Sequence, residues 1–151
     1  MEVGRGDPKT PEATALLEAS HALMQSLFPA ESNHYLSIDE LTRPNIRFFI
    51  ATDDGAAVGC GALAVMDGYG EVKSMYVAPD ARGAGAGAAL LCAIEAEARA
   101  AALPTLKLET GDSLTAAHRL YERGGFSFCG PFGEYAEGPH SVFMEKLLSA
   151  A

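Results

Sequence analysis

Apolar and polar residues follow two different periods in the first half of the chain. Between Glu12 and Phe28, apolar residues recur every three or four positions, which predicts an amphipathic helix that ends at Pro29. The turn sequence Asp53-Asp54-Gly55 between two apolar runs is typical of a β-hairpin. The three strands predicted here form an antiparallel meander and cover Ile46–Thr52, Ala57–Val65 and Glu71–Val77.

A different order of elements is predicted after Val77. A helix rich in alanine and leucine runs from a glycine-rich loop to about Ala101, and Gly124-Gly125 ends a second helix over Thr115–Arg123. The strands predicted in this half cover Thr105–Glu109, Phe126–Cys129 and Val142–Leu147. One strand–helix–strand crossover therefore follows the meander. The pattern predicts a single mixed α/β domain over residues 1–151.

Three local signals add detail to this pattern. The run Ser37-Ile38-Asp39-Glu40 matches a capping box and predicts a short helix over Ser37–Leu41. Either Asp112 or Ser113 is available as the N-cap of the helix that begins at Thr115. The polar residues 1–10 predict a short edge strand or a frayed end.

The stretch from Val77 to Leu91 carries the clearest chemical signal. An apolar strand ends at Pro79, the run Arg82-Gly83-Ala84-Gly85-Ala86-Gly87 follows, and an alanine-rich helix then begins. Glycines let the backbone approach a ligand closely, and the free N–H groups at the start of a helix attract anions. This order therefore predicts a phosphate-binding loop.

Other phosphate-binding loops fit this stretch less well. A Walker loop ends in Gly-Lys-Ser/Thr, whereas Gly87 is followed by two alanines. Gly83, Gly85 and Gly87 do not have the spacing of the dinucleotide fingerprint, although Glu109 lies about 22 residues after Gly87, near the position of its acidic residue. From the loop alone, a nucleotide-binding domain and a plain glycine-rich turn stay open.

Two segments together resemble the GCN5-related N-acetyltransferase (GNAT) superfamily. The Arg82–Gly87 loop is similar to its coenzyme A pyrophosphate loop, and Leu120–Phe126 is similar to its Leu-Tyr-x-x-x-Gly-Phe segment. The resemblance covers Leu16–Leu147 and is strongest to small bacterial single-domain members. It implies a GNAT-like fold, with a central, mostly antiparallel mixed sheet that is splayed at the cofactor site and flanked by helices. The chain departs from the pattern at Leu114, where many relatives carry an asparagine that contacts the cofactor.

The resemblance implies acetyl-CoA as co-substrate and two groups of residues that hold it. The backbone of the loop would face the pyrophosphate, at Arg82, Gly83, Gly85, Gly87 and Ala88. Unpaired amides of the preceding strand would hold the acyl group, at Met75, Tyr76 and Val77. In the alternative, these three are ordinary strand residues with side chains in the core. The Arg82 side chain either contacts phosphate or caps the turn.

Two side chains are implied to take part in the chemistry. Tyr121 corresponds to the tyrosine near the cofactor sulfur, where its phenol would protonate the leaving thiolate. The alternative is a core tyrosine packed under Phe126. Glu71 stands eleven residues before Arg82, as does the general base of the histone-acetylating branch. In the alternatives, Glu71 is a solvated residue at the start of the strand or an ion-pair partner of Lys73. A water relay would then act as the base.

The face that Glu71 occupies depends on the regularity of its strand. In a regular strand Glu71, Lys73, Met75 and Val77 share one face, unless a bulge intervenes. The acceptor is expected in a cleft between two loops, Ala30–Tyr35 and Phe132–His140. The candidate substrate-binding residues in these loops are His34, Tyr35 and Tyr135.

The sequence therefore predicts an acetyl-CoA-dependent N-acetyltransferase. The expected reaction moves acetyl from acetyl-CoA to a primary amine of a small molecule, by direct attack in a ternary complex. A protein N-terminal or lysine acetyltransferase is the alternative enzyme, and a non-catalytic CoA-binding module is the alternative without turnover. The acceptor, the length of the acyl group and the oligomeric state stay open, and edge strands that pair would give a homodimer.

The amino-acid composition and the spacing of the cysteines exclude several classes of partner. The formal net charge is −9, with 11 Lys and Arg against 20 Asp and Glu, so nucleic acid is not an expected partner. The three cysteines, Cys60, Cys92 and Cys129, lack metal-ligand spacing, so no metal is expected. No apolar segment is long enough to span a bilayer, and the N-terminus lacks a secretory core. We therefore expect a cytoplasmic protein without a membrane partner.

Overall fold

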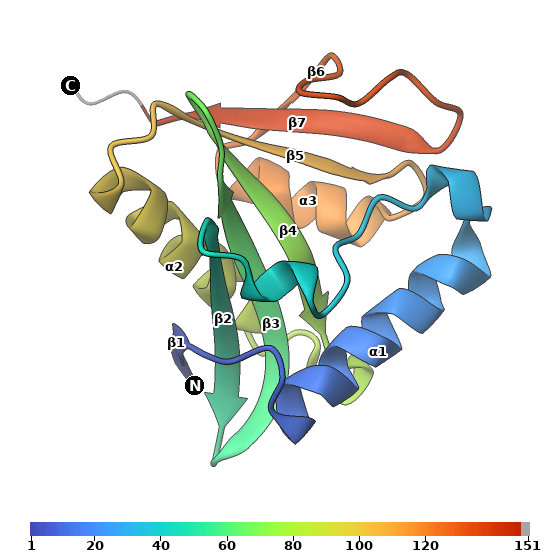
Figure 1. The fold of residues 1–151 in the computed structure, drawn as a ribbon. Helices are drawn as coiled ribbons and strands as arrows, with labels where there is room; N and C mark the ends of the chain where they lie inside the picture. The colour runs from blue at the N-terminus through green and yellow to red at the C-terminus, as the bar shows by residue number, and fades with distance from the viewer. Residues whose placement is uncertain (149–151) are drawn as a thin grey trace.

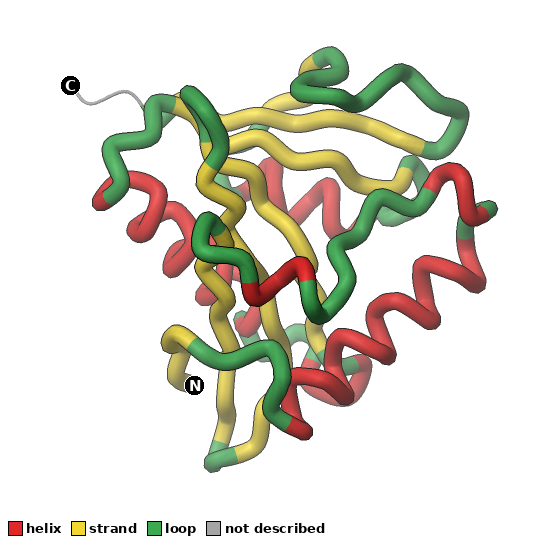
Figure 2. The backbone as a smooth tube through the Cα atoms, in the orientation of Figure 1, coloured by secondary structure: helices red, strands yellow, loops and turns green. Residues whose placement is uncertain are grey.

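The computed structural model describes residues 1–148, whose strands form one seven-stranded sheet (Figures 1 and 2). The strand order is β1-β2-β3-β4-β5-β7-β6, and neighbouring strands are antiparallel except for the parallel pair β4 and β5. This architecture confirms the mixed, mostly antiparallel sheet predicted from the sequence. The strands are β1 (Glu2–Arg5), β2 (Ile46–Asp53), β3 (Ala56–Val65), β4 (Gly70–Val77), β5 (Thr105–Gly111), β6 (Ser127–Cys129) and β7 (Ser141–Leu147).

Helices cover both faces of the sheet, as Figure 1 shows. They are α1 (Pro11–Leu27), α2 (Ala86–Ala100) and α3 (Thr115–Arg123), with 3₁₀ turns η1 (Ala30–Ser32), η2 (Glu40–Thr42) and η3 (Pro79–Ala81). Successive residues of β2 and β3 point to opposite faces. Phe48 and Ala62 pack with α1, whereas Phe49 and Leu63 pack with α2. Burial of both faces gives the sheet a hydrophobic core on each side.

Local chemistry accounts for most of the boundaries. Thr10 caps α1 by accepting a hydrogen bond from the N–H of Ala13. Asp54 and Gly55 both have positive φ, 50° and 80°, as a two-residue turn between β2 and β3 requires. Ser37 and Glu40 make the reciprocal bonds of a capping box. The box precedes the 3₁₀ turn Glu40–Thr42, however, and not a helix over Ser37–Leu41 as predicted.

The predicted cap of α3 is wrong. The N-cap is Leu114, and no side chain caps this helix. The N–H of Leu114 bonds the carbonyl of Gly111 at 3.2 Å, so a backbone turn at the end of β5 leads directly into the helix. Asp112 and Ser113 lie within that turn and are too early to cap α3.

A bulge in β4 decides which side chains reach the site. The β3–β4 register passes from Ala62↔Lys73 to Cys60↔Tyr76, so Ser74 and Met75 together oppose Gly61. Ser74 has φ of +57°, in the left-handed region. A Cβ on Gly61 would lie 2.5 Å from the sulfur of Met75, so any side chain at position 61 would force Met75 to shift.

The bulge changes the face assignments predicted from strand alternation. Glu71, Lys73 and Tyr76 lie opposite Ala64, Ala62 and Cys60, on the α1 side of the sheet. Met75 and Val77 pack against the core on the α2 side. The four residues Glu71, Lys73, Met75 and Val77 were expected to share one face only in a strand without a bulge. The bulge is present, and its extra residue reverses the alternation after Lys73.

The sheet is splayed between its two middle strands. The parallel pairing of β4 with β5 consists of Gly70↔Leu106 and Glu71↔Lys107. In contrast, β5 pairs with β7 along its whole length, from Thr105 to Gly111. Beyond Glu71, β4 diverges from β5, and this divergence confirms the splay predicted from the resemblance.

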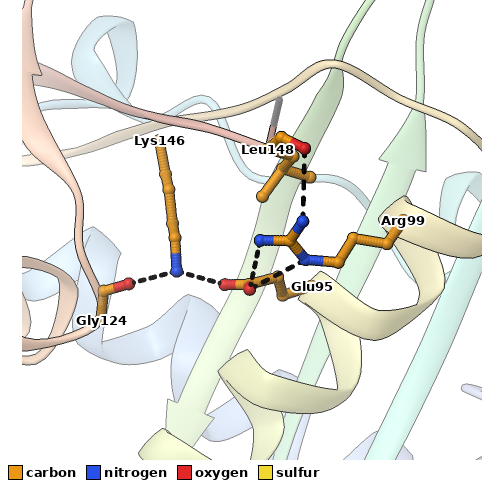
Figure 3. A network of polar contacts seen from close by, with 5 residues as sticks. All are labelled: Glu95, Arg99, Gly124, Lys146 and Leu148. Carbon is orange, nitrogen blue, oxygen red and sulfur yellow. Dashed lines mark hydrogen bonds and ion pairs between the residues drawn. The ribbon is translucent and has the colours of Figure 1, made fainter. Parts of the chain in front are cut away.

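A polar network ties α2 to the C-terminal part of the sheet (Figure 3). Lys146 Nζ on β7 donates to Glu95 at 2.6 Å and to the carbonyl of Gly124 at 2.8 Å. Arg99 donates to the other oxygen of Glu95 at 3.1 and 3.2 Å, and to the carbonyl of Leu148 at 3.3 Å. Glu95 therefore links α2 to β7 and, through Lys146, to the end of α3.

Replacing Glu95 with glutamine is expected to lower stability in a pH-dependent way. Burial raises the pKa of Glu95, but the hydrogen bonds from Lys146 and Arg99 outweigh it, so the folded-state pKa lies below the usual 4.5. The contribution of the carboxylate is therefore complete above pH 4.5 and is lost as pH falls through that lower pKa. We expect Glu95→Gln to cost about 1 kcal/mol at neutral pH. Thermal unfolding of both proteins against pH measures this, and a gap that persisted at pH 2 would contradict it.

Candidate active site

The glycine-rich loop delivers free backbone donors to the start of α2. Gly83 and Gly85 have φ of +87° and +90°, which side-chain-bearing residues rarely adopt. Gly85 is the N-cap of α2, and no side chain caps the helix there. The first helical bond runs from the N–H of Ala89 to the carbonyl of Gly85. The N–H groups of Ala86, Gly87 and Ala88 are therefore left for an anion.

Gly87 and Arg82 also have structural tasks within the loop. A Cβ on Gly87 would lie 3.1 Å from a methyl carbon of Leu120, so this glycine allows α2 to pack closely on α3. The Nε of Arg82 donates to the carbonyl of Val77 at 3.2 Å. Arg82 thus links the loop to the end of β4. Its side chain is exposed, and the remaining N–H groups of its guanidinium are available to a ligand.

A small cavity of about 140 Å³ lies in the gap between β4 and β5. The bulge residues Ser74 and Met75 line one side, and Glu109 on β5 and Tyr121 on α3 line others. The hydroxyl oxygen of Ser74 is buried and has no hydrogen-bond partner within residues 1–148. A ligand with a polar group would form a hydrogen bond with this hydroxyl. The cavity therefore suits the polar arm of an acyl-CoA better than it suits an apolar ligand.

Tyr121 joins the hydrophobic core to this small cavity. Its side chain is 6% exposed, and its ring packs edge-to-face against Phe126 with centroids 5.8 Å apart. Burial raises the pKa of Tyr121 above its usual value of 10, so the phenol keeps its proton at neutral pH. Tyr121 is thus a core residue that also lines the small cavity, and its phenol is protonated.

A large open cleft of about 1250 Å³ adjoins the small cavity. It lies between the segments around residues 29–46 and 133–141, which overlap the two loops predicted to contact the acceptor, Ala30–Tyr35 and Phe132–His140. His34, Tyr35 and Tyr135 all line it. Lys73 and His140 line both spaces, as do His34 and Tyr35, so the two spaces meet along shared residues.

A buried polar cluster lies where β4 enters the large cleft. Tyr135 donates its hydroxyl proton to Glu71 Oε2, and Lys73 Nζ lies 3.2 Å from the same oxygen. Lys73 also donates to the hydroxyl of Tyr135 at 2.8 Å and to the carbonyl of His34 at 3.0 Å. Burial and the neighbouring Glu71 raise the pKa of Tyr135, which therefore stays protonated. The cluster holds both acceptor loops against β4.

Tyr35 is held on the opposite side, against α1. Its ring stacks on His21 with centroids 4.1 Å apart, and its hydroxyl accepts a hydrogen bond from Gln25 at 2.7 Å. Burial lowers the pKa of His21, so this histidine is neutral at physiological pH. The stacked pair fixes the loop after α1 to that helix and thereby shapes one wall of the cleft.

The structure brings one further ionisable residue to the site. Glu109 on β5 lines the small cavity with Tyr121, and it accepts a hydrogen bond from the hydroxyl of Ser141 at 2.8 Å. Burial raises the pKa of Glu109 above 4.5. From the sequence, Glu109 was a candidate solely for the acidic position of a dinucleotide fingerprint.

The comparisons identify the family. Residues 14–126 match the Acetyltransferase (GNAT) family. The chain belongs to this family. It is 47% identical over 150 residues to IAA acetyltransferase of Azospirillum brasilense, with 98% of each chain covered. This GNAT protein is accordingly an N-acetyltransferase.

Solved structures agree with the fold of this GNAT protein. A candidate acyl-CoA N-acyltransferase from Klebsiella pneumoniae has a TM-score of 0.82 and 35% identity, covering 98% of this chain and 97% of its own. A GNAT acetyltransferase from Elizabethkingia anophelis, solved with acetyl-CoA bound, has a TM-score of 0.69 and 21% identity, covering 97% of each chain. The second likeness shows a shared fold, in a protein that binds acetyl-CoA.

The predicted site residues fall into two groups in this GNAT protein. Met75, which lines the small cavity, begins the group predicted for the cofactor. These residues follow a track along the chain from the end of β4 to the first turn of α2: Met75, Tyr76, Val77, Arg82, Gly83, Gly85, Gly87 and Ala88. Glu71 lies with the acceptor residues His34 and Tyr135 in the large cleft, whereas Tyr121 lies in the small cavity. Among residues 1–148, no metal-binding cluster is found and no helix is long and apolar enough to cross a membrane.

Proposed function

We propose that this GNAT protein transfers acetyl from acetyl-CoA to a primary amine of a small molecule, by direct attack in a ternary complex. One observation carries the proposal: a large cleft and a small cavity meet along His34, Tyr35, Lys73 and His140, beside the splayed strand β4. An acceptor in the cleft and an acyl group in the gap between β4 and β5 would thus approach each other from opposite directions.

The proposed donor site follows the track from β4 to α2. The pyrophosphate of acetyl-CoA would accept hydrogen bonds from the N–H groups of Ala86, Gly87 and Ala88, with the positive end of the helix dipole adding attraction. Gly83 and Gly85 give the loop its shape, and Arg82 adds a positive charge. Among Met75, Tyr76 and Val77, the backbone N–H groups that face the gap would bind the acyl arm, and one of them would polarise the thioester carbonyl.

The proposed chemistry needs a proton donor and a binding site for the amine. Tyr121 would protonate the sulfur as the carbon–sulfur bond breaks, since its phenol keeps its proton at neutral pH. Glu71, predicted from the sequence as the general base, lines the large cleft and would take a proton from the ammonium group of the acceptor, directly or through water. Cys60 is not suited to form a covalent acetyl intermediate, because burial raises the pKa of its thiol to about 12 and keeps it protonated.

Two points favour a small acceptor. The large cleft lies between two loops that the Lys73–Tyr135 and Tyr35–Gln25 hydrogen bonds hold in place, which suits a compact molecule. The relative at 47% identity has the name IAA acetyltransferase, so a small molecule is the natural first choice for the acceptor here.

A panel of acceptors tests this function. The wild-type protein is incubated with acetyl-CoA and one acceptor at a time, and thiol release is followed with and without that acceptor. The acceptors are tyramine, spermidine, L-lysine, n-butylamine and a peptide with a free N-terminal amine. We expect amine-dependent release with at least one small molecule, and weaker release with the peptide. Calorimetry with acetyl-CoA, with ATP as control, measures donor binding separately. Binding without any amine-dependent release would favour a CoA-binding module, and preference for the peptide would favour a protein acetyltransferase.

A further inference from the structure

An apolar floor lies beside Glu71 in the large cleft. The strand register places Ile46, Ala64 and Glu71 in one row across β2, β3 and β4, because Ile46 is opposite Ala64 and Ala64 is opposite Glu71. Residues directly opposite each other on antiparallel strands project to the same face of the sheet, with Cβ atoms about 5 Å apart. All three line the large cleft. The floor of the cleft is therefore charged at β4 and apolar from β3 to β2.

Met66 extends this apolar floor toward the turn between β3 and β4. It lines the cleft two residues after Ala64, and its side chain is 38% exposed. Ile46 and Ala64 are mostly covered by the protein itself, so Met66 offers the larger uncovered apolar area. A ligand that covers such an area is stabilised by removing it from water, and a methionine side chain adapts to ligands of different shapes.

Aromatic side chains form a wall beside this floor. Tyr69 and Tyr135 line the large cleft, and both pack edge-to-face against Phe132, with ring centroids 5.7 and 5.1 Å apart. Tyr135 also packs edge-to-face against His34 at 5.3 Å. These contacts hold the rings in place before a ligand arrives, so binding orders few further side chains. An aromatic ligand would gain edge-on or offset ring contacts at this wall.

The charged and apolar ends of the cleft differ in their relation to the small cavity. Lys73, the ion-pair partner of Glu71, lines both spaces. Ile46, Ala64 and Met66 line the large cleft alone. The nitrogen of the acceptor must lie near Glu71 and the small cavity, where it would attack the thioester. The rest of the acceptor then extends away from the small cavity, over the apolar floor.

The charged residues of the cleft offer a weaker basis for selection. Arg43 pairs with Glu40 at 3.3 Å, and Lys73 lies 3.2 Å from Glu71, so each of these cations already faces a carboxylate. Three further carboxylates line the cleft and are exposed to solvent: Glu31, Glu134 and Glu137. Water and salt screen charges in such positions, whereas the gain from covering apolar surface is not screened.

We propose that the acceptor of this enzyme is a primary amine joined by a short apolar chain to an aromatic ring; this rests on the proposed N-acetyltransferase function. The ammonium group lies at Glu71, and the chain and ring cover Ala64, Ile46 and Met66 beside Tyr69. Met66 determines specificity, because it provides the apolar surface that the ring covers. Phenethylamine is a simple compound of this class.

A matched series of amines tests this acceptor class. For the wild type, kcat/KM is measured at saturating acetyl-CoA with ethylamine, n-butylamine, n-hexylamine, phenethylamine and cadaverine. From ethylamine to n-hexylamine we expect a rise of about fourfold per added methylene, and phenethylamine is expected to exceed ethylamine at least about tenfold. Cadaverine carries an ammonium group where n-hexylamine has its terminal methyl. It is expected to fall below n-hexylamine, since that charge would lose water over the apolar floor.

Variants of Met66 test the residue that carries the selection. Met66→Ser is expected to lower the ratio of kcat/KM for phenethylamine over ethylamine about three- to tenfold, while ethylamine itself reacts as with the wild type. Met66→Leu, which keeps an apolar side chain, is expected to retain the ratio. Leu147→Ser is the matched control, because Leu147 is 69% exposed but lies on β7 and does not line the cleft. Melting temperatures of all variants check that a change in the ratio does not come from lost stability.

The results separate this inference from the proposed function. If no amine of this series or of the earlier panel gives thiol release, the proposed function fails and the acceptor class fails with it. If amines are acetylated but ethylamine and phenethylamine react equally well, the function stands and the inference is overturned. Cadaverine above n-hexylamine, with a preference that falls as salt is added, would also overturn it, in favour of selection by the exposed carboxylates. A ratio in Met66→Ser equal to that of Leu147→Ser would refute the role of Met66.

Discussion

Replacing Tyr121 with phenylalanine is expected to slow acetyl transfer about 10²–10⁴-fold in a single turnover. The variant loses the protonated phenol beside the small cavity, so the leaving thiolate departs without a proton. The ring itself keeps its contact with Phe126 and its place in the core. We therefore expect the melting temperature and the affinity for acetyl-CoA to stay close to those of the wild type.

Single-turnover rate, melting temperature and donor affinity must come from the same preparation, because Tyr121 is both a core residue and a proposed acid. A core role predicts a lower melting temperature, and an acid role predicts a lower rate alone. Tyr121→Leu serves as the matched control, since it removes the ring and is expected to lower stability by about 2–4 kcal/mol. An unimpaired single-turnover rate in Tyr121→Phe would remove Tyr121 from the mechanism.

Placing glutamate at Ala88 is expected to weaken acetyl-CoA binding at least about tenfold, or 1.4 kcal/mol. Ala88 is exposed in the first turn of α2, where its N–H group has no helical partner. A carboxylate there repels the pyrophosphate and competes for the free N–H groups. The same charge at a helix N-terminus stabilises the helix by about 0.3–1 kcal/mol, so the fold is expected to be kept or slightly strengthened.

Calorimetry with acetyl-CoA, together with thermal unfolding, measures both effects of Ala88→Glu. The control is Ala88→Gln, which has the same shape without the charge and is expected to bind within about threefold of the wild type. Raising the salt concentration should narrow the gap between the two variants, because the repulsion is screened. Equal affinities of the two variants at low salt would place the pyrophosphate away from the start of α2.

Ala88 is a better position for this test than the glycines of the loop. A side chain at Gly87 would press on Leu120 and disturb the packing of α2 on α3, so lost binding would have two explanations. Any side chain at Gly85 would face the strain of φ near +90°. Substitutions at these glycines therefore change the shape of the loop as well as its contacts.

The sequence predicted the order of elements because local physical signals agreed with the fold. Strand alternation and the turn at Asp54-Gly55 specified the hairpin of β2 and β3, and the glycines at 124 and 125 ended α3. Helical periodicity predicted α1 to within one residue at each end, since its cap Thr10 and the following Pro29 act locally. The glycine-rich loop could be predicted for the same reason, because its turn and the free N–H groups at the start of α2 come from adjacent residues.

The sequence alone could not predict which side of the sheet each β4 side chain occupies. The bulge at Ser74 and Met75 depends on Gly61 of another strand, which leaves room for the sulfur of Met75. No local pattern within Glu71–Val77 predicts the bulge. The same holds for Glu109, whose raised pKa comes from burial among residues of several elements.

By itself, then, the sequence determined the mixed α/β fold, its single crossover and a glycine-rich loop at the start of α2, since each depends on residues close together in the chain. Only the tertiary structure decided which carboxylate shares a cavity with Tyr121, because that depends on where β4 and β5 separate. It also decided that Glu71 is matched by Lys73 and Tyr135, the latter from a loop 64 residues away. Burial and pairing set the proton affinity of a side chain, and both arise from contacts between segments distant in sequence.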